Sequence, residues 1–134
     1  MGAWGVEPFE NDKALDWVYE LKKTDDESEL RRAIETVVNL SSDEYMDLRY
    51  CCEAIAAAEV ITALKGSPPQ WLTTEVGAWV AAHPSVNYAP LIPIALQALE
   101  RIRTDSEAKE LWADSKHNEE WLRSTNDLEA RLRQ

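Results

Sequence analysis

The sequence is poor in the residues and runs on which several common classes of protein depend. Its 134 residues include only two cysteines, Cys51 and Cys52, which are adjacent and form no Cys-x-x-Cys motif. The two histidines form no metal-ligand pattern with a carboxylate pair. There is no run of about 18 apolar residues and no arginine-flanked apolar signal segment. These absences predict a protein without a metal site or a membrane partner, located in the reducing cytoplasm.

Basic side chains are also scarce, with 14 Lys and Arg against 25 Asp and Glu and a formal net charge of −11. Nucleic-acid binding draws its free energy from clustered Lys and Arg, so the composition argues against a nucleic-acid partner. A basic partner suits this charge better. Residues 1–65 hold 15 acids and residues 104–134 hold eight, whereas residues 66–103 hold two. The nearly uncharged middle is therefore expected to form the core.

Helical periodicity is what the sequence has in abundance, since apolar residues recur at the i, i+3, i+4, i+7 spacing almost everywhere past residue 11. No strand-like alternation competes with it. The expected helices cover about 12–23, 25–39, 44–65 after caps at Ser41–Asp43, 71–83, 90–103, 107–114 and 119–133. We therefore predict an all-α fold in one domain, residues 1–134: a compact bundle of six or seven helices over 12–134, with an extended N-terminal segment, 1–11, packed against it.

The N-terminal segment differs from the rest because it combines glycines, a proline and two large aromatic residues without periodicity. Trp4 and Phe9 are apolar enough to serve as anchors that hold this segment against the helices. A binding loop is the alternative interpretation.

Several motifs together connect this chain to a known family. The opening reads Gly-Ala-Trp-Gly-x-x-Pro-Phe-Glu-Asn-Asp-x-Ala-Leu-Asp-Trp, and shorter motifs follow in the middle and near the end. These motifs lie at Gly2–Trp17, Ala57–Glu59, Leu64–Gly66, Glu110–Ser115 and Glu120–Leu122. In them the chain resembles, over its whole length, a bacterial family known only as a domain of unknown function, number 4259. The resemblance implies a shared fold and assigns no activity.

Glu59 is the most unusual single residue, because no other charged residue occurs between Ala54 and Leu64. A carboxylate buried without partners is very costly, so Glu59 must find hydrogen-bond donors or take up a proton. It either accepts hydrogen bonds from the N-terminal segment, for example from Trp4 Nε1, and pins that segment to its helix, or acts as an acid of raised pKa in a pocket.

No other constellation predicts chemistry. Asn11, Asp12 and Asp16 offer oxygen ligands but lack the pattern of a calcium loop, and helix capping explains them better. There is no glycine-rich phosphate loop and no Ser/His/Asp set. We therefore predict no catalytic residue, no metal and no cofactor, and favour a protein that is not an enzyme.

The leading hypothesis is a non-enzymatic protein-interaction domain, of a toxin-neutralising (immunity-type) or regulatory kind, whose acidic surface attracts a basic protein partner. The acidic residues proposed for this contact are Asp25, Asp26, Glu27 and Glu29.

Trp17 and Trp79 lie on apolar stripes and are expected in the core. Trp71, Trp112 and Trp121 are expected to pack between helices, and the alternative for some of them is an exposed aromatic patch. The alternative to an interaction domain is a small enzyme or ligand-binding domain with Glu59 buried beneath the N-terminal segment. The oligomeric state stays open.

Overall fold

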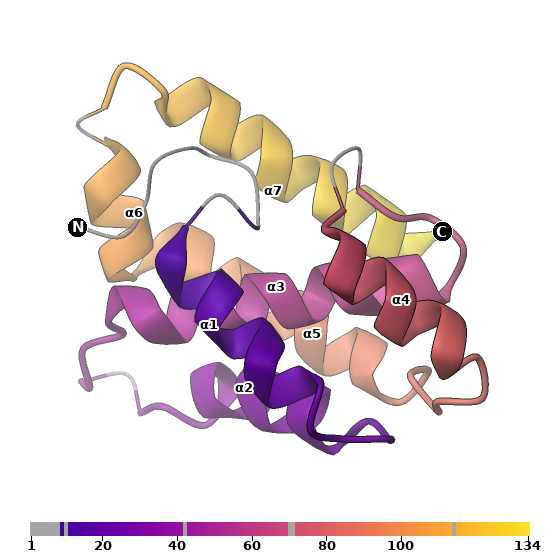
Figure 1. The fold of residues 1–134 in the computed structure, drawn as a ribbon. Helices are drawn as coiled ribbons and strands as arrows, with labels where there is room; N and C mark the ends of the chain where they lie inside the picture. The colour runs from indigo at the N-terminus through magenta and orange to yellow at the C-terminus, as the bar shows by residue number, and fades with distance from the viewer. Residues whose placement is uncertain (1–8, 10, 42, 70–71, 114) are drawn as a thin grey trace.

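The computed structural model describes residues 9, 11–41, 43–69, 72–113 and 115–134, and these residues form seven helices and no strand (Figure 1). The helices are α1 (Asp12–Leu21), α2 (Ser28–Val38), α3 (Leu48–Leu64), α4 (Thr74–Ala82), α5 (Leu91–Thr104), α6 (Glu107–Ala113) and α7 (Asn118–Arg133). The predicted all-α class is confirmed. The predicted N-terminal segment lies outside the described residues except for Phe9 and Asn11, which are both buried.

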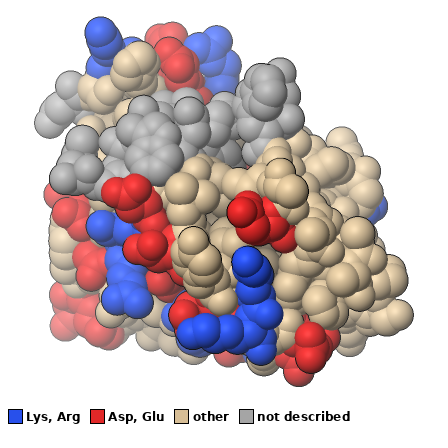
Figure 2. Space-filling view, in the orientation of Figure 1, with Lys and Arg blue, Asp and Glu red and all other residues tan. Residues whose placement is uncertain are grey.

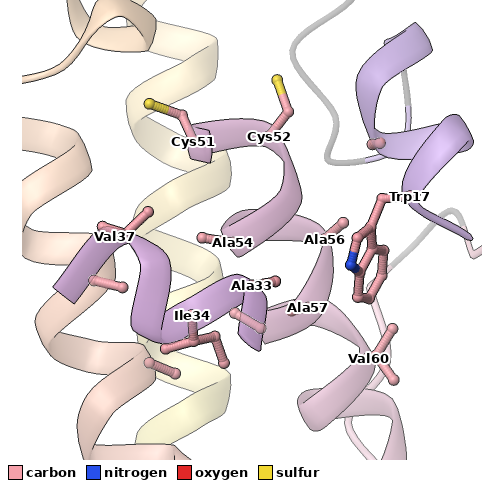
Figure 3. Packing of buried hydrophobic residues seen from close by; sticks show 14 of the residues in the cluster. Trp17, Ala33, Ile34, Val37, Cys51, Cys52, Ala54, Ala56, Ala57 and Val60 are labelled. Carbon is pink, nitrogen blue, oxygen red and sulfur yellow. The ribbon is translucent and has the colours of Figure 1, made fainter. Parts of the chain in front are cut away.

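Helix α3 is the centre of the bundle and packs against each of the other six helices. Twelve of its 17 residues are buried, because its sequence is apolar around nearly the whole helix. Many of these residues are alanines, whose small side chains let neighbouring helices approach closely. Figure 3 shows Trp17 of α1 beside Ala56 and Val60 of α3, with Ile34 and Val37 of α2 on another side.

The expectation that residues 66–103 form the core is wrong, because α3 precedes that range. Only α5 within the range contributes a long buried stripe, whereas α4 buries just Val76 and Trp79. Figure 2 shows that the side covered by α4 carries few charged side chains although it faces outward. The small number of charged residues in 66–103 therefore has two causes, the buried stripe of α5 and the nearly uncharged outer side of α4 (Figure 2).

The starts of α1 and α3 follow local capping signals, but the residue that caps α3 is not the one expected from the sequence. Asn11 caps α1 by accepting a hydrogen bond from the Ala14 N–H at 2.7 Å. The expected caps at Ser41–Asp43 are wrong, since α3 begins after Asp47, whose carboxylate accepts from the Tyr50 N–H at 3.3 Å. The reason is tertiary: Met46 is buried, and its carbonyl accepts a hydrogen bond from the first residue of α6. This hydrogen bond keeps Met46 outside α3.

The predicted core positions of Trp17 and Trp79 are confirmed, with exposed fractions of 1% and 5%. Each indole N–H has a partner, at Glu29 Oε2 for Trp17 and at the Thr24 carbonyl for Trp79. Among the described residues, no helix is both long and apolar enough to cross a membrane.

Candidate interaction and binding sites

Glu59 is fully buried, and its carboxylate is held by a guanidinium group from α7. Arg131 Nη1 donates to Glu59 Oε1 at 2.6 Å, and Nη2 donates to Oε2 at 3.0 Å. Thr62 Oγ1 donates to Oε1 at 3.2 Å. Burial raises the pKa of Glu59, and the hydrogen bonds and positive charge of Arg131 oppose that rise. The arrangement is a bidentate ion pair that joins α3 to α7.

This geometry changes the interpretation of Glu59. The donors that the described residues provide come from α7 and α3, whereas the sequence suggested the N-terminal segment. Trp4, the suggested indole donor, lies outside the described residues, so its contact with Glu59 stays a prediction. Both carboxylate oxygens of Glu59 already accept hydrogen bonds from Arg131, so neither is presented to a substrate.

The acidic residues proposed for a partner divide into two groups. Asp25, Asp26 and Glu27 lie in the turn between α1 and α2, where the Asp25 side chain is 97% exposed and 3.2 Å from His83 Nε2. Glu29 instead turns toward the protein, with a side chain only 14% exposed. Its Oε2 accepts hydrogen bonds from Trp17 Nε1 at 2.8 Å and from Arg32. Glu29 therefore supports local structure.

The alternative of an exposed tryptophan patch is wrong for Trp121, which is only 3% exposed and packs between helices. On α7, Trp121 lies on the same apolar stripe as Leu128 and Leu132, and this stripe faces the bundle. Trp112 is half-buried and packs against the core. Trp71 lies outside the described residues.

A surface that sequence analysis missed surrounds Tyr45, whose side chain is 58% exposed. Tyr45 Oη donates to Glu110 Oε1 at 3.4 Å, and partial desolvation with the charges of Glu107 and Glu110 raises the pKa of Tyr45. Asp43 and Glu44 precede Tyr45 and are exposed. We call Asp43, Glu44, Tyr45, Glu107 and Glu110 the Tyr45 surface. Within the described residues, none of its four carboxylates forms an ion pair with Lys or Arg.

Backbone contacts hold the two halves of the Tyr45 surface together. The Glu107 N–H donates to the Met46 carbonyl at 2.9 Å, and Glu107 Oε1 accepts from the Leu48 N–H at 2.6 Å. Glu107 and Glu110 come from α6, about sixty positions away in the sequence. The only local signal was an aromatic residue directly after two acids, Asp43 and Glu44.

The second candidate site is a cleft of about 570 Å³ between α1, α2 and α3, which we call the α1–α3 cleft. It is lined by Lys13, Asp16, Trp17, Glu20, Glu29, Arg32, Arg49 and Glu53. Figure 2 shows blue and red side chains mixed on the side of the molecule where α1 and α2 lie. The sequence singled out Asp16 as an oxygen ligand that helix capping explains better, and it gave no indication of the arginines.

The buried carboxylate of Glu53 and the partly buried carboxylate of Glu29 hold the arginines of this cleft. Glu53 is 6% exposed and accepts hydrogen bonds from Arg32 Nη2 at 2.9 Å and from Arg49 Nε at 3.1 Å. Arg32 also donates from Nε and Nη2 to Glu29 at 2.9 and 2.6 Å. The hydrogen bonds to Glu29 and Glu53, against the opposing effect of desolvation, raise the pKa of Arg32. The guanidinium group of Arg32 is therefore held by two carboxylates, whereas that of Arg49 is held through Nε alone.

The two cysteines could also carry chemistry, but their surroundings are those of structural core residues. Cys51 and Cys52 are buried, and burial raises the pKa of Cys52 to about 12. No group of three or more His, Cys, Asp or Glu side chains within the described ranges is arranged to hold a metal ion.

Comparison with known proteins gave one match. The model of a family described as a domain of unknown function, DUF4259, matches residues 2–124. No curated protein matches the chain, and no solved structure matches it either.

Proposed function

This chain belongs to the DUF4259 family, a domain of unknown function, and we propose that it is a non-enzymatic protein-interaction domain that binds a basic partner through the Tyr45 surface. The observation that carries the proposal is the exposed aromatic ring of Tyr45 among four carboxylates, none of which forms an ion pair with a Lys or Arg of the described residues. Some surface carboxylates elsewhere, such as Glu20 and Glu35, do have such partners.

The proposed contact combines two interactions. A tyrosine side chain loses little conformational entropy on binding, and tyrosines are enriched among the residues that dominate interface energies. A Lys or Arg side chain of the partner would lie over the Tyr45 ring in a cation–π contact while its charge pairs with Glu107 or Glu110. The net charge of −11 would attract a basic partner over a longer range.

The turn that holds Asp25, Asp26 and Glu27 has a secondary role in this proposal. It adds negative charge, but it has no exposed aromatic residue to anchor a partner, and Asp25 already contacts His83. Toxin neutralisation and regulation are both settings in which an acidic domain binds a basic protein. A small enzyme built on Glu59 is less well supported, because Arg131 occupies both carboxylate oxygens.

The test is an affinity purification from the native host, followed by measurement of binding to the purified partner. Tyr45→Ala is expected to weaken binding by about 2 kcal/mol, roughly thirtyfold, and Glu110→Gln to weaken it less. Tyr19→Ala is the matched control, because Tyr19 is an exposed tyrosine on α1, 64% accessible. Raising the salt concentration is expected to slow association.

The control variant Asp25→Asn/Asp26→Asn separates the two acidic surfaces. Full binding by Tyr45→Ala, together with loss of binding in this double variant, would move the interface to the α1–α2 turn. A partner that is itself acidic, or one whose association does not respond to salt, would contradict the proposal as a whole.

A further inference from the structure

We propose that the α1–α3 cleft binds a small zwitterion of the α-amino acid class, with its carboxylate on Arg32 and Arg49 and its ammonium group on Asp16 and Glu20. This site is separate from the Tyr45 surface, and its ligand is a small molecule. The inference rests on the hydrogen-bonding capacity that the cleft leaves open and on the position of its charges.

The two arginines of the cleft have N–H groups that none of the hydrogen bonds among the described residues uses. Arg49 uses only Nε, which donates to Glu53, and its side chain is 71% exposed. Arg32 uses Nε and Nη2. Among the hydrogen bonds of the described residues, none employs the terminal nitrogens of Arg49 or Nη1 of Arg32. These N–H groups can donate to a carboxylate, which planar guanidinium groups bind with good geometry.

Arg32 is also held in place before any ligand arrives, by Glu29 and Glu53. Glu53 and Glu29 are largely buried, and the indole N–H of Trp17 in turn holds Glu29. Binding therefore need not order the Arg32 side chain, which reduces the conformational entropy that the ligand has to offset. Because the buried carboxylates have accepted their own partners, they do not compete for the remaining N–H groups.

The α1 side of the cleft supplies the opposite charge. Lys13, Asp16, Trp17 and Glu20 lie at the i, i+3, i+4, i+7 spacing of one helical face, and all four line the cleft. Asp16 is exposed and forms no ion pair within the described chain, while Glu20 has only the exposed pair with Lys23. These carboxylates favour an ammonium group and repel a phosphate dianion. Lys13 adds a third positive charge to those of Arg32 and Arg49, and these three charges favour a ligand that also carries an anionic group.

The size of the cleft agrees with this ligand class. A volume of about 570 Å³ lies within the range of roughly 300–1,000 Å³ that is usual for small-molecule sites. It leaves room for the side chain of an amino acid in addition to its two charged groups. A purely anionic or purely cationic ligand would leave one side of the cleft without a partner.

The experiment measures binding of each common L-amino acid by isothermal titration calorimetry at constant ionic strength. Acetate, methylammonium and inorganic phosphate serve as probes of single charges. We expect saturable one-to-one binding of at least one amino acid, with acetate and methylammonium about tenfold weaker or worse. Arg49→Gln is expected to weaken amino-acid binding about tenfold while lowering the melting temperature only slightly, because Arg49 is largely exposed and Arg32 still pairs with Glu53.

Two further variants complete the test. Asp16→Asn is expected to weaken amino-acid binding but leave acetate binding unchanged, since it removes only the ammonium partner. Arg123→Gln is the matched control, as Arg123 is an exposed arginine on α7 outside the cleft, and it should bind like the unmodified protein. The proposal is overturned if no amino acid binds at about 10 mM, if phosphate or acetate binds equally well, or if Arg49→Gln binds normally.

Discussion

Replacing Arg131 by methionine tests the central feature of the core, the buried pair with Glu59. Methionine keeps much of the length and apolar contact of the arginine stem but removes both hydrogen bonds to the carboxylate, at 2.6 and 3.0 Å. Glu59 is fully buried, so its charge would then have no compensation except Thr62 Oγ1. Breaking a buried ion pair in this way costs about 3–5 kcal/mol. That is a large part of a typical domain stability of about 5–15 kcal/mol.

Urea unfolding followed by circular dichroism and tryptophan fluorescence measures this loss. For a domain of this size, each kcal/mol lowers the melting temperature by roughly 3–5 °C, so Arg131→Met should melt about 9–25 °C lower. Glu59→Gln keeps the shape and most acceptors, and its expected loss is smaller, about 1–3 kcal/mol. The double variant Glu59→Met/Arg131→Met leaves no buried charge and should be more stable than Arg131→Met alone.

The loss in Arg131→Met also depends on pH. Burial raises the pKa of Glu59, and without Arg131 nothing comparable opposes that rise. A carboxyl whose folded pKa exceeds its unfolded pKa of about 4.3 stabilises the fold at low pH, and this contribution is lost as pH increases through the folded pKa. The stability gap between Arg131→Met and the unmodified protein should therefore narrow on going from pH 8 to pH 5.

Three results would refute this reasoning about the pair. The first is a loss below about 1 kcal/mol for Arg131→Met, which is the range of an exposed ion pair. The second is a double variant no more stable than the single one. The third is a stability gap that is constant between pH 5 and pH 8. Each would mean that Glu59 is not a buried charge that depends on Arg131.

Three other predictions address the remaining polar contacts and the thiols. Trp17→Phe removes the indole donor to Glu29, which should cost about 1.5–3 kcal/mol in urea unfolding, and a loss near zero would contradict the 2.8 Å hydrogen bond. Arg101→Met leaves three carbonyls at the end of α2 without the donor that now lies 2.6–3.1 Å away, so amide exchange in the last turn of α2 should accelerate and stability should fall by about 2 kcal/mol. Because burial raises the pKa of Cys51 and brings that of Cys52 to about 12, neither thiol should react with a thiol reagent at pH 7 until urea unfolds the protein, and fast reaction of the native protein would contradict this.

The sequence determined the features that depend on neighbours within one or two helical turns. The helix stripes predicted the number and approximate positions of the helices, and the core positions of Trp17 and Trp79. An isolated charge in an apolar helix singled out Glu59, which is fully buried. The 3.6-residue period is a property of the local chain, and side chains must follow it wherever the helix finally packs.

The tertiary structure alone decided which helices meet, and every functional feature depends on that. Arg131 reaches Glu59 across 72 positions, and Glu110 reaches Tyr45 across 65. Trp121 is buried because its side of α7 faces the bundle, although its neighbours in the sequence are charged. Contacts of this kind arise when the faces of two helices pack together. The periodicity of one helix does not indicate which other helix its apolar face will meet. For the same reason, the composition shows an excess of acidic residues but does not show where they gather. The fold distinguishes the carboxylates that pair with Lys or Arg from the four carboxylates of the Tyr45 surface.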